Sequence, residues 1–171
     1  MDLAEVAARA ADLTDERELA DLRAASDEEI EQAVRGPDFR IRAMGYRAIG
    51  PLRFRQKVEL LRRGLEDESP ACRGAALISL ELLSRDQPGD VNAVRPMLHT
   101  LANSDPNGTV RRLAVMCLKN GSPSRDSIVL LEHIAEAEDD RDLRAVADRI
   151  AAVLRKRASQ THYRDPRARQ R

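Results

Sequence analysis

The sequence lacks tryptophan and contains only four other aromatic residues, Phe39, Tyr46, Phe54 and Tyr163. So few aromatic rings argue against a surface on which the bases of single-stranded nucleic acid stack. The chain can still form a continuous core, because 42% of its 171 residues are apolar, mainly Leu, Ile, Val, Met and Ala. Long alternation of Val, Ile and Thr is also absent, whereas the good helix formers Ala, Leu, Arg and Glu dominate. We therefore predict an all-α protein about one domain in length.

Cysteine and long apolar runs are scarce as well. The two cysteines, Cys72 and Cys117, are too few for a disulfide framework and do not belong to a Cys-x-x-Cys pair. Both lie in apolar stretches and are predicted to be small buried side chains. No window approaches 18 apolar residues, and the acidic N-terminus does not resemble a secretory signal. We therefore predict a cytoplasmic protein without a membrane partner.

Patterns typical of catalysis or cofactor binding are missing too. The eight glycines form no phosphate-binding loop, and the acidic stretch from Glu136 to Asp142 is typical of a solvated turn. His99 and His133 are 34 residues apart and could be neighbours on adjacent helices, where a carboxylate or thiol would be needed to complete a metal site. Because no third ligand has a suitable spacing, we favour two surface histidines. We predict no enzyme activity, no cofactor and no metal.

What the sequence does contain is a repeat. Four segments, "IRAMGYRAI", "CRGAALISL", "VRRLAVMCL" and "LRAVADRIA", can be placed in one register. Each begins with an apolar residue and an arginine, and a small residue follows three positions later. The arginines are Arg42, Arg73, Arg111 and Arg144, separated by 31, 38 and 33 residues, and the small residues are Gly45, Ala76, Ala114 and Ala147.

A second helical pattern precedes each of these segments. It is clearest in "KVELLRRGLEDESP", where Val58, Leu61 and Leu65 follow the spacing of one helix face. Turn residues separate the two patterns in each copy: Gly36-Pro37-Asp38, Ser69-Pro70, Asp105-Pro106-Asn107-Gly108 and Asp139-Asp140. The unit is therefore a helix, a tight turn and a second helix, repeated four times.

This pattern resembles the HEAT repeats, a family of α-solenoid proteins. In that family an acidic turn precedes an apolar-arginine pair and a small residue in the second helix, and Asp105, Val110, Arg111 and Ala114 match this best. The resemblance implies a short right-handed α-solenoid of about four helix pairs. Because arrays of this family serve mostly as scaffolds for other proteins, the resemblance also implies a scaffold function. We expect the repeated arginines to bond acidic turn residues, among them Asp38, Asp67, Asp105 and Asp140, and the small residues to allow close helix approach.

We predict three parts along the chain. Residues 1–24 form an acidic N-terminal capping helical segment, since terminal repeats need a polar outer face. Residues 25–157 form the HEAT-like repeat domain. Residues 158–171 are polar and aperiodic and are predicted to be a disordered basic tail.

The net charge is zero, but the charges are segregated. Residues 1–38 carry 12 acids and 4 bases, whereas residues 39–64 carry 8 bases and one acid. Two interpretations of this basic band remain open. The cations could hold an anionic partner such as nucleic acid, or they could neutralise the acidic N-terminal residues. The candidate binding cations are Arg40, Arg47, Arg53, Arg55 and Lys57.

Two of the central second helices are apolar nearly all round. Leu77, Ile78, Val115 and Met116 lie off the main apolar stripe, and such helices are usually buried by other repeats or by a second chain. Our leading hypothesis is a non-enzymatic adaptor that holds another protein on its second-helix surface, with these four residues as partner contacts. The alternative is a nucleic-acid-binding protein that uses the basic band 40–63 and the tail.

Overall fold

The computed structural model describes the backbone of residues 1–164 and the side chains of residues 1–161. The described residues form helices and turns, without a strand, so the all-α prediction is confirmed. The chain divides into two compact units, Met1–Asp90 and Val91–Arg171, which are treated separately. No helix among residues 1–164 combines the length and the apolar character that a membrane crossing requires.

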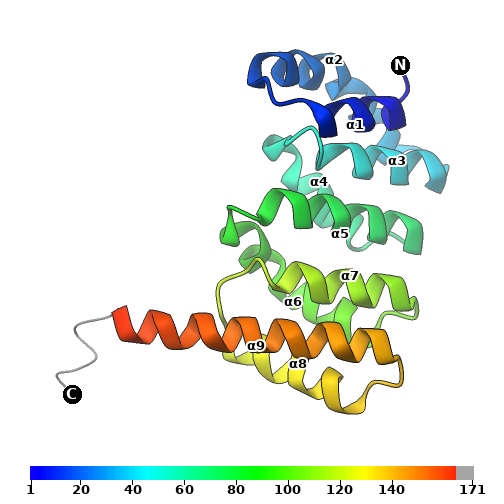
Figure 1. Cartoon of the computed structure of the whole chain (residues 1–171). Helices are drawn as coiled ribbons and strands as arrows, with labels where there is room; N and C mark the ends of the chain where they lie inside the picture. Colours follow the sequence, from blue (N-terminus) through cyan, green and yellow to red (C-terminus); the bar gives the residue numbers. More distant parts are fainter. Residues whose placement is uncertain (165–171) are drawn as a thin grey trace. The chain divides into compact units, whose positions relative to one another are not determined.

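The predicted helix pairs are all present. The first unit contains α1 (Leu3–Asp12), α2 (Glu16–Arg35), α3 (Phe39–Ile49), the 3-10 turn η1 (Arg55–Lys57), α4 (Val58–Gly64) and α5 (Pro70–Ser84). Almost all of α6 (Pro88–Ser104) belongs to the second unit, with α7 (Gly108–Leu118), α8 (Arg125–Ala137) and α9 (Arg141–Arg164). The pairs are α2/α3, α4/α5, α6/α7 and α8/α9. Within the first unit, the second helices α3 and α5 lie in one layer with α1, while α7 and α9 lie together in the second unit (Figure 1).

The second helices begin at the turn residues that the sequence predicts. The Asp38 carboxylate accepts a hydrogen bond from the Arg40 backbone N–H at 2.8 Å, and the Asn107 side chain accepts one from the Val110 N–H at 3.1 Å. Pro70 opens α5. Each group satisfies or removes a backbone donor that the first helical turn leaves unpaired.

Small residues bring neighbouring helices close together. A Cβ atom on Gly45 would lie 2.8 Å from Val34 Cγ1 of α2, and one on Gly64 would lie 2.7 Å from the Ala76 Cβ of α5. Ala114 and Ala147 are fully buried. A larger side chain at these positions would push the packed helices apart.

An arginine in a left-handed conformation redirects the chain after α3. Arg53 has φ 50°, its N–H donates to the Gly50 carbonyl, and the Phe54 N–H donates to the Ile49 carbonyl. These paired bonds form a Schellman motif, in which glycine usually takes the left-handed position. Phe54 and Ile49 are both buried, and their apolar packing stabilises a conformation that costs a non-glycine residue about 1–2 kcal/mol.

Two of the predicted boundaries are wrong. The boundary between residues 24 and 25 falls inside α2, because the helical pattern of the capping segment continues without a break into the first repeat. Residues 158–164 are helical rather than disordered, because they contain no proline or glycine that would end α9, and the Ser159 and Thr161 hydroxyls donate to backbone carbonyls of the preceding turn. The rest of the predicted tail, residues 165–171, lies outside the described residues.

Candidate partner-binding groove on the second helices

A groove of about 310 Å³ runs between α7 and α9 in the second unit. Each helix contributes one stripe of residues three, four or seven positions apart, which share a helix face. The stripe of α7 consists of Arg112, Met116 and Lys119, and that of α9 consists of Val146, Arg149, Ile150 and Val153.

The floor of the groove is apolar and partly open to solvent. Val146 and Ile150 are nearly buried, whereas Met116 is 36% exposed and Val153 is 42% exposed. These two are among the few large hydrophobic residues that remain exposed in the described part of the chain. Exposed apolar side chains gathered in a groove are typical of an interaction surface.

The rim of the groove is positively charged. Arg112, Lys119 and Arg149 are exposed, and the ion pairs found among the described residues involve none of them. No acidic side chain within residues 1–161 lines the groove. Cations nearby are paired instead: Arg111 binds Glu138 at 2.8 Å and Arg155 binds Glu132 at 2.7 Å. The three rim cations are thus available to an outside partner.

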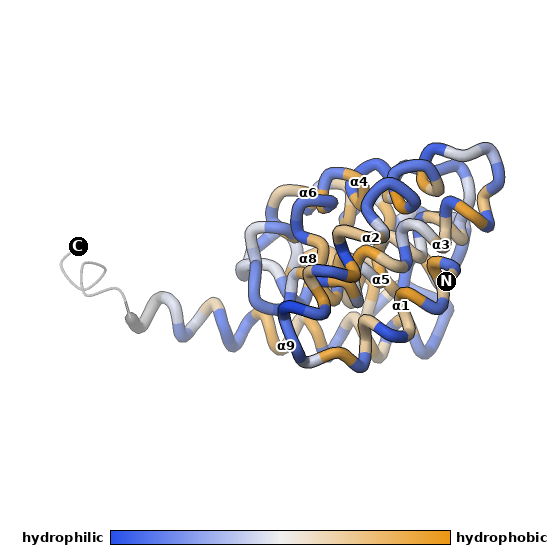
Figure 2. The backbone as a smooth tube through the Cα atoms, turned by 90° about the horizontal axis from the view of Figure 1, so that it is seen from above, coloured by the Kyte–Doolittle hydropathy of each residue, from blue (hydrophilic) through white to orange (hydrophobic). Residues whose placement is uncertain are grey.

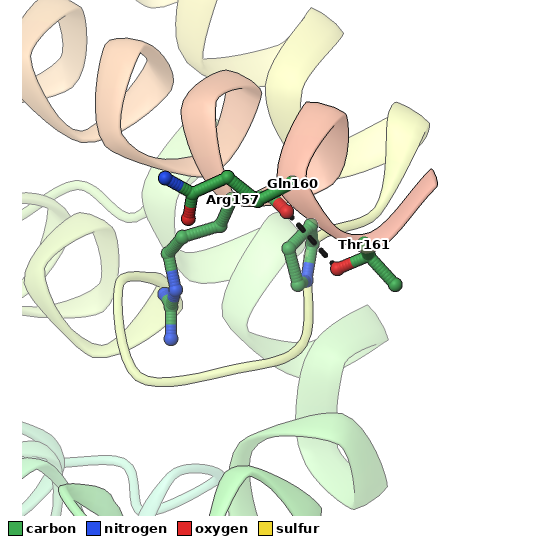
Figure 3. A pocket seen from close by; sticks show the side chains of 4 residues that line it. Arg157, Gln160 and Thr161 are labelled. Atoms are coloured by element: carbon green, nitrogen blue, oxygen red, sulfur yellow. Dashed lines mark hydrogen bonds between the residues drawn. The ribbon is translucent and has the colours of Figure 1, made fainter. Parts of the chain in front are cut away.

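The C-terminal half of α9 is held beside the groove. The Arg157 guanidinium donates to the backbone carbonyl of Lys119 at the end of α7. A second hollow, of about 360 Å³, is lined by Pro123, Arg157, Gln160 and Thr161, and Figure 3 shows the last three projecting from α9 beside the loop that precedes α8. Hydrophilic residues prevail in this part of α9 (Figure 2). The surface of α9 beyond the end of α7 is therefore polar.

Two of the four repeated arginines, Arg42 and Arg111, bond acidic side chains of a turn, as predicted, but not always the expected residue. Arg42 makes a two-pronged ion pair with Asp67, at 2.9 and 3.0 Å. Burial alone would raise the pKa of Asp67, but the hydrogen bonds from Arg42 and from the Ser69 backbone N–H, together with the charge of Arg42, hold this pKa below its ordinary value. Arg111 binds Glu138 rather than Asp105 or Asp140. These arginines join successive repeats.

The basic band does not form one free cationic surface. Lys57 binds both Asp27 and Glu31, and the distance from its Nζ to Glu31 Oε1 is 2.6 Å. Arg53 lies 3.8 Å from Glu16, and Arg55 lies 3.3 Å from Asp90. The structure therefore favours internal neutralisation for these three cations.

Two of the five candidate cations remain unpaired on the surface. Arg40 and Arg47 are exposed and take part in none of the ion pairs among the described side chains. The guanidinium of Arg40 lies over the Phe39 ring, 5.4 Å from its centre. Arg63 is a further exposed cation of the band, but three of the five candidate cations are lost from the cluster of phosphate contacts that the nucleic-acid hypothesis requires.

Only part of the predicted apolar surface is accessible. Leu77 and Val115 are fully buried, so the prediction that they contact a partner is wrong. Leu77 lies on α5, which packs on both α3 and α4, and Val115 lies on α7, which packs on α9. Ile78 is half-buried, and Met116 lies in the groove. The α9 stripe was missed, although Val146, Arg149, Ile150 and Val153 show its helical spacing in the sequence.

The histidines and cysteines have structural environments. The His99 Nε2 lies 2.8 Å from the Ser127 hydroxyl, and His133 is exposed. Among the described residues, no group of three His, Cys, Asp or Glu side chains is placed to hold a metal. Both cysteines are buried, as predicted. Burial raises the pKa of the Cys72 thiol, which makes that thiol a poor nucleophile.

Helix pairs that stack through small residues and share arginine–acid contacts define the class of α-solenoid repeat proteins. A family model for HEAT repeats matches residues 26–119, more than half of the chain, and the chain belongs to this family. No curated protein matches the chain. HEAT repeats commonly act as scaffolds for protein interaction.

Proposed function

We propose that the protein is a non-enzymatic, cytoplasmic scaffold or adaptor, which binds a partner protein through its second-helix surface at the α7–α9 groove. The observation that carries this proposal is the combination of exposed Met116 and Val153 with an apolar floor. Protein interfaces place apolar residues at their centre and polar residues at their rim. The groove has this arrangement, and membership of the HEAT-repeat family supports it.

Nucleic-acid binding through residues 40–63 is the less favoured function. Lys57, Arg53 and Arg55 already have acidic partners in the chain, so three of the five candidate cations are not free to bind phosphates. Binding of nucleic acid would also leave the apolar floor of the α7–α9 groove unexplained. The experiment below separates the two functions.

Photo-crosslinking in lysate of source cells tests the proposal. A benzophenone amino acid replaces Met116 or Val153 in the full chain, and the matched control carries it at Val129, an exposed apolar residue of the first helix α8. We expect discrete protein adducts from positions 116 and 153 that survive nuclease treatment, and none from position 129. Adducts from position 129 alone, or adducts lost on nuclease treatment, would contradict the proposal.

A further inference from the structure

The charges of the α7–α9 groove define the chemistry of its partner. We infer that this groove holds an acidic amphipathic helix, with apolar residues on one face and Asp or Glu beside them. The inference rests on the proposed function, since it names the class of segment that the partner protein would supply.

The first argument is charge complementarity. All three charged residues that line the groove, Arg112, Lys119 and Arg149, are cations, and all are exposed. Two of them, Arg112 and Lys119, stand on either side of Met116 along α7. A ligand that buries apolar side chains against Met116 therefore places its flanking residues among positive charges. Complementary charge selects partners and speeds their encounter, so acidic flanking residues are favoured and basic ones are repelled.

The second argument is the length of the groove. Residues 112 to 119 span seven helical positions, which at about 1.5 Å per residue correspond to about 10 Å, or two turns of helix. A helical ligand of two to three turns presents apolar side chains at positions i, i+3, i+4 and i+7 along such a groove. The stripes of α7 and α9 repeat at the same spacing, so the apolar side chains of the ligand match the floor between them.

The third argument separates a protein helix from nucleic acid. Nucleic acid binds through phosphates to clustered cations and through bases that stack on aromatic rings. Among the described side chains, none that is aromatic lines the groove, and its floor consists of Met116, Val146, Ile150 and Val153. A phosphate backbone would leave this floor unused, whereas an apolar helix face covers it.

A peptide-display selection on the full chain tests the inference. The library contains three-turn peptides with Leu or Ile at i, i+3, i+4 and i+7, and with Glu, Lys, Ser or Gln at random elsewhere. The selection is repeated with Arg112→Glu/Arg149→Glu, which reverses two rim cations. The matched control is Arg125→Glu/Arg144→Glu, which reverses two exposed cations outside the groove and has the same net charge. Circular dichroism melts establish that all variants fold.

We expect the sequences enriched on the native chain and on the control to carry net negative charge. Reversal of the rim cations should abolish this enrichment and weaken binding of the best acidic peptide about tenfold, since attraction becomes repulsion at two positions. Neutral or basic enriched sequences, no enrichment, or equal weakening by both double variants would overturn the inference. The inference would also be overturned if the native chain bound a fluorescent oligonucleotide more tightly than the best acidic peptide, and if reversal of the rim cations abolished this binding.

The outcomes distinguish this inference from the proposed function. If enriched peptides show no charge preference but lose binding in Met116→Glu, the groove docks protein and only the acidic chemistry is wrong. If the benzophenone at positions 116 and 153 captures no protein, the scaffold proposal itself fails, whatever the charge of the selected peptides.

Discussion

At the residue scale, three of the five cations that the sequence suggests as a binding surface form ion pairs within the fold. Lys57 is the clearest example, since its side chain is only 12% exposed and lies between Asp27 and Glu31. Burial alone would lower the pKa of Lys57, but the hydrogen bonds to both carboxylates outweigh it and raise the pKa. The hydrogen bond from Lys57 in turn lowers the pKa of Glu31. This cluster ties the start of α4 to α2.

Replacement of this lysine should destabilise the protein in a pH-dependent way. We expect Lys57→Met to lower the free energy of unfolding at pH 7 by about 1–2 kcal/mol, since charge-assisted hydrogen bonds are lost. The depressed pKa of Glu31 stabilises the fold above its ordinary pKa of 4.5, and this contribution is lost as the pH falls through the lower folded value. Urea titrations from pH 7 to pH 3 should show that the difference in free energy of unfolding between the native chain and the variant becomes smaller below pH 4.5.

The matched control is Arg62→Met, because Arg62 is 56% exposed and its ion pair with Glu59 spans 3.6 Å. Exposed pairs of this kind contribute less than about 1 kcal/mol. An equal loss of stability in both variants, or a constant difference at all pH values, would show that the Lys57 cluster is not the cause.

At the element scale, helix packing depends on side-chain volume at a few contacts. Gly64 ends α4 against Ala76 of α5, and the Tyr46 ring lies 3.0 Å from the position of an added Cβ. Glycine weakens a helix by roughly 0.5–1 kcal/mol relative to alanine. Here the close approach outweighs that penalty, and the helices gain contact area that a larger residue would remove.

Gly64→Ala should therefore destabilise the protein despite the better helix propensity of alanine. We expect a loss of about 1–3 kcal/mol, typical of overpacking, measured by thermal or urea unfolding. Gly89→Ala is the control, since Gly89 lies in α6 with no atom within 4 Å of an added Cβ, and it should stabilise the protein by roughly 0.5–1 kcal/mol. Stabilisation by both substitutions would contradict the packing argument.

At the scale of the whole molecule, a repeat protein is stabilised mainly by contacts between neighbours. In the first unit α5 buries nine residues, whereas α1 buries three, Leu3, Val6 and Ala10. The helix α1 also lies at one edge of its layer (Figure 1). Local opening is easiest where the fewest buried contacts must break.

Hydrogen exchange should reveal this difference in local stability between α1 and α5. We expect backbone amides of α1 to exchange about tenfold faster or more than those of α5, measured by mass spectrometry on peptides from the full chain. Val6→Ala should accelerate exchange in α1 and leave α5 unchanged, because Val6 is 2% exposed and packs at the edge of the layer. Equal protection of the two helices would mean that the first unit opens only as a whole.

The helix pairs were predictable because the signals that define them are local. Apolar spacing marks one helix face, and residues such as Asp38, Pro70 and Asn107 begin the second helices through bonds or rings within a few positions. The arginine register and the small residues were predictable for the same reason. The continuation of α9 beyond residue 158 was not, since polar composition alone does not separate an exposed helix from a disordered tail.

The surface depends on contacts between residues far apart in the chain. Lys57 meets Glu31 across 26 positions, and this contact turns a predicted ligand-binding cation into a structural one. Leu77 is hidden because α5 has neighbours on more than one side. The groove exists because α7 and α9 lie side by side, which brings Met116 next to Val153 and leaves three cations unpaired around them. Periodicity describes one helix at a time, whereas a binding surface is made where two helices meet.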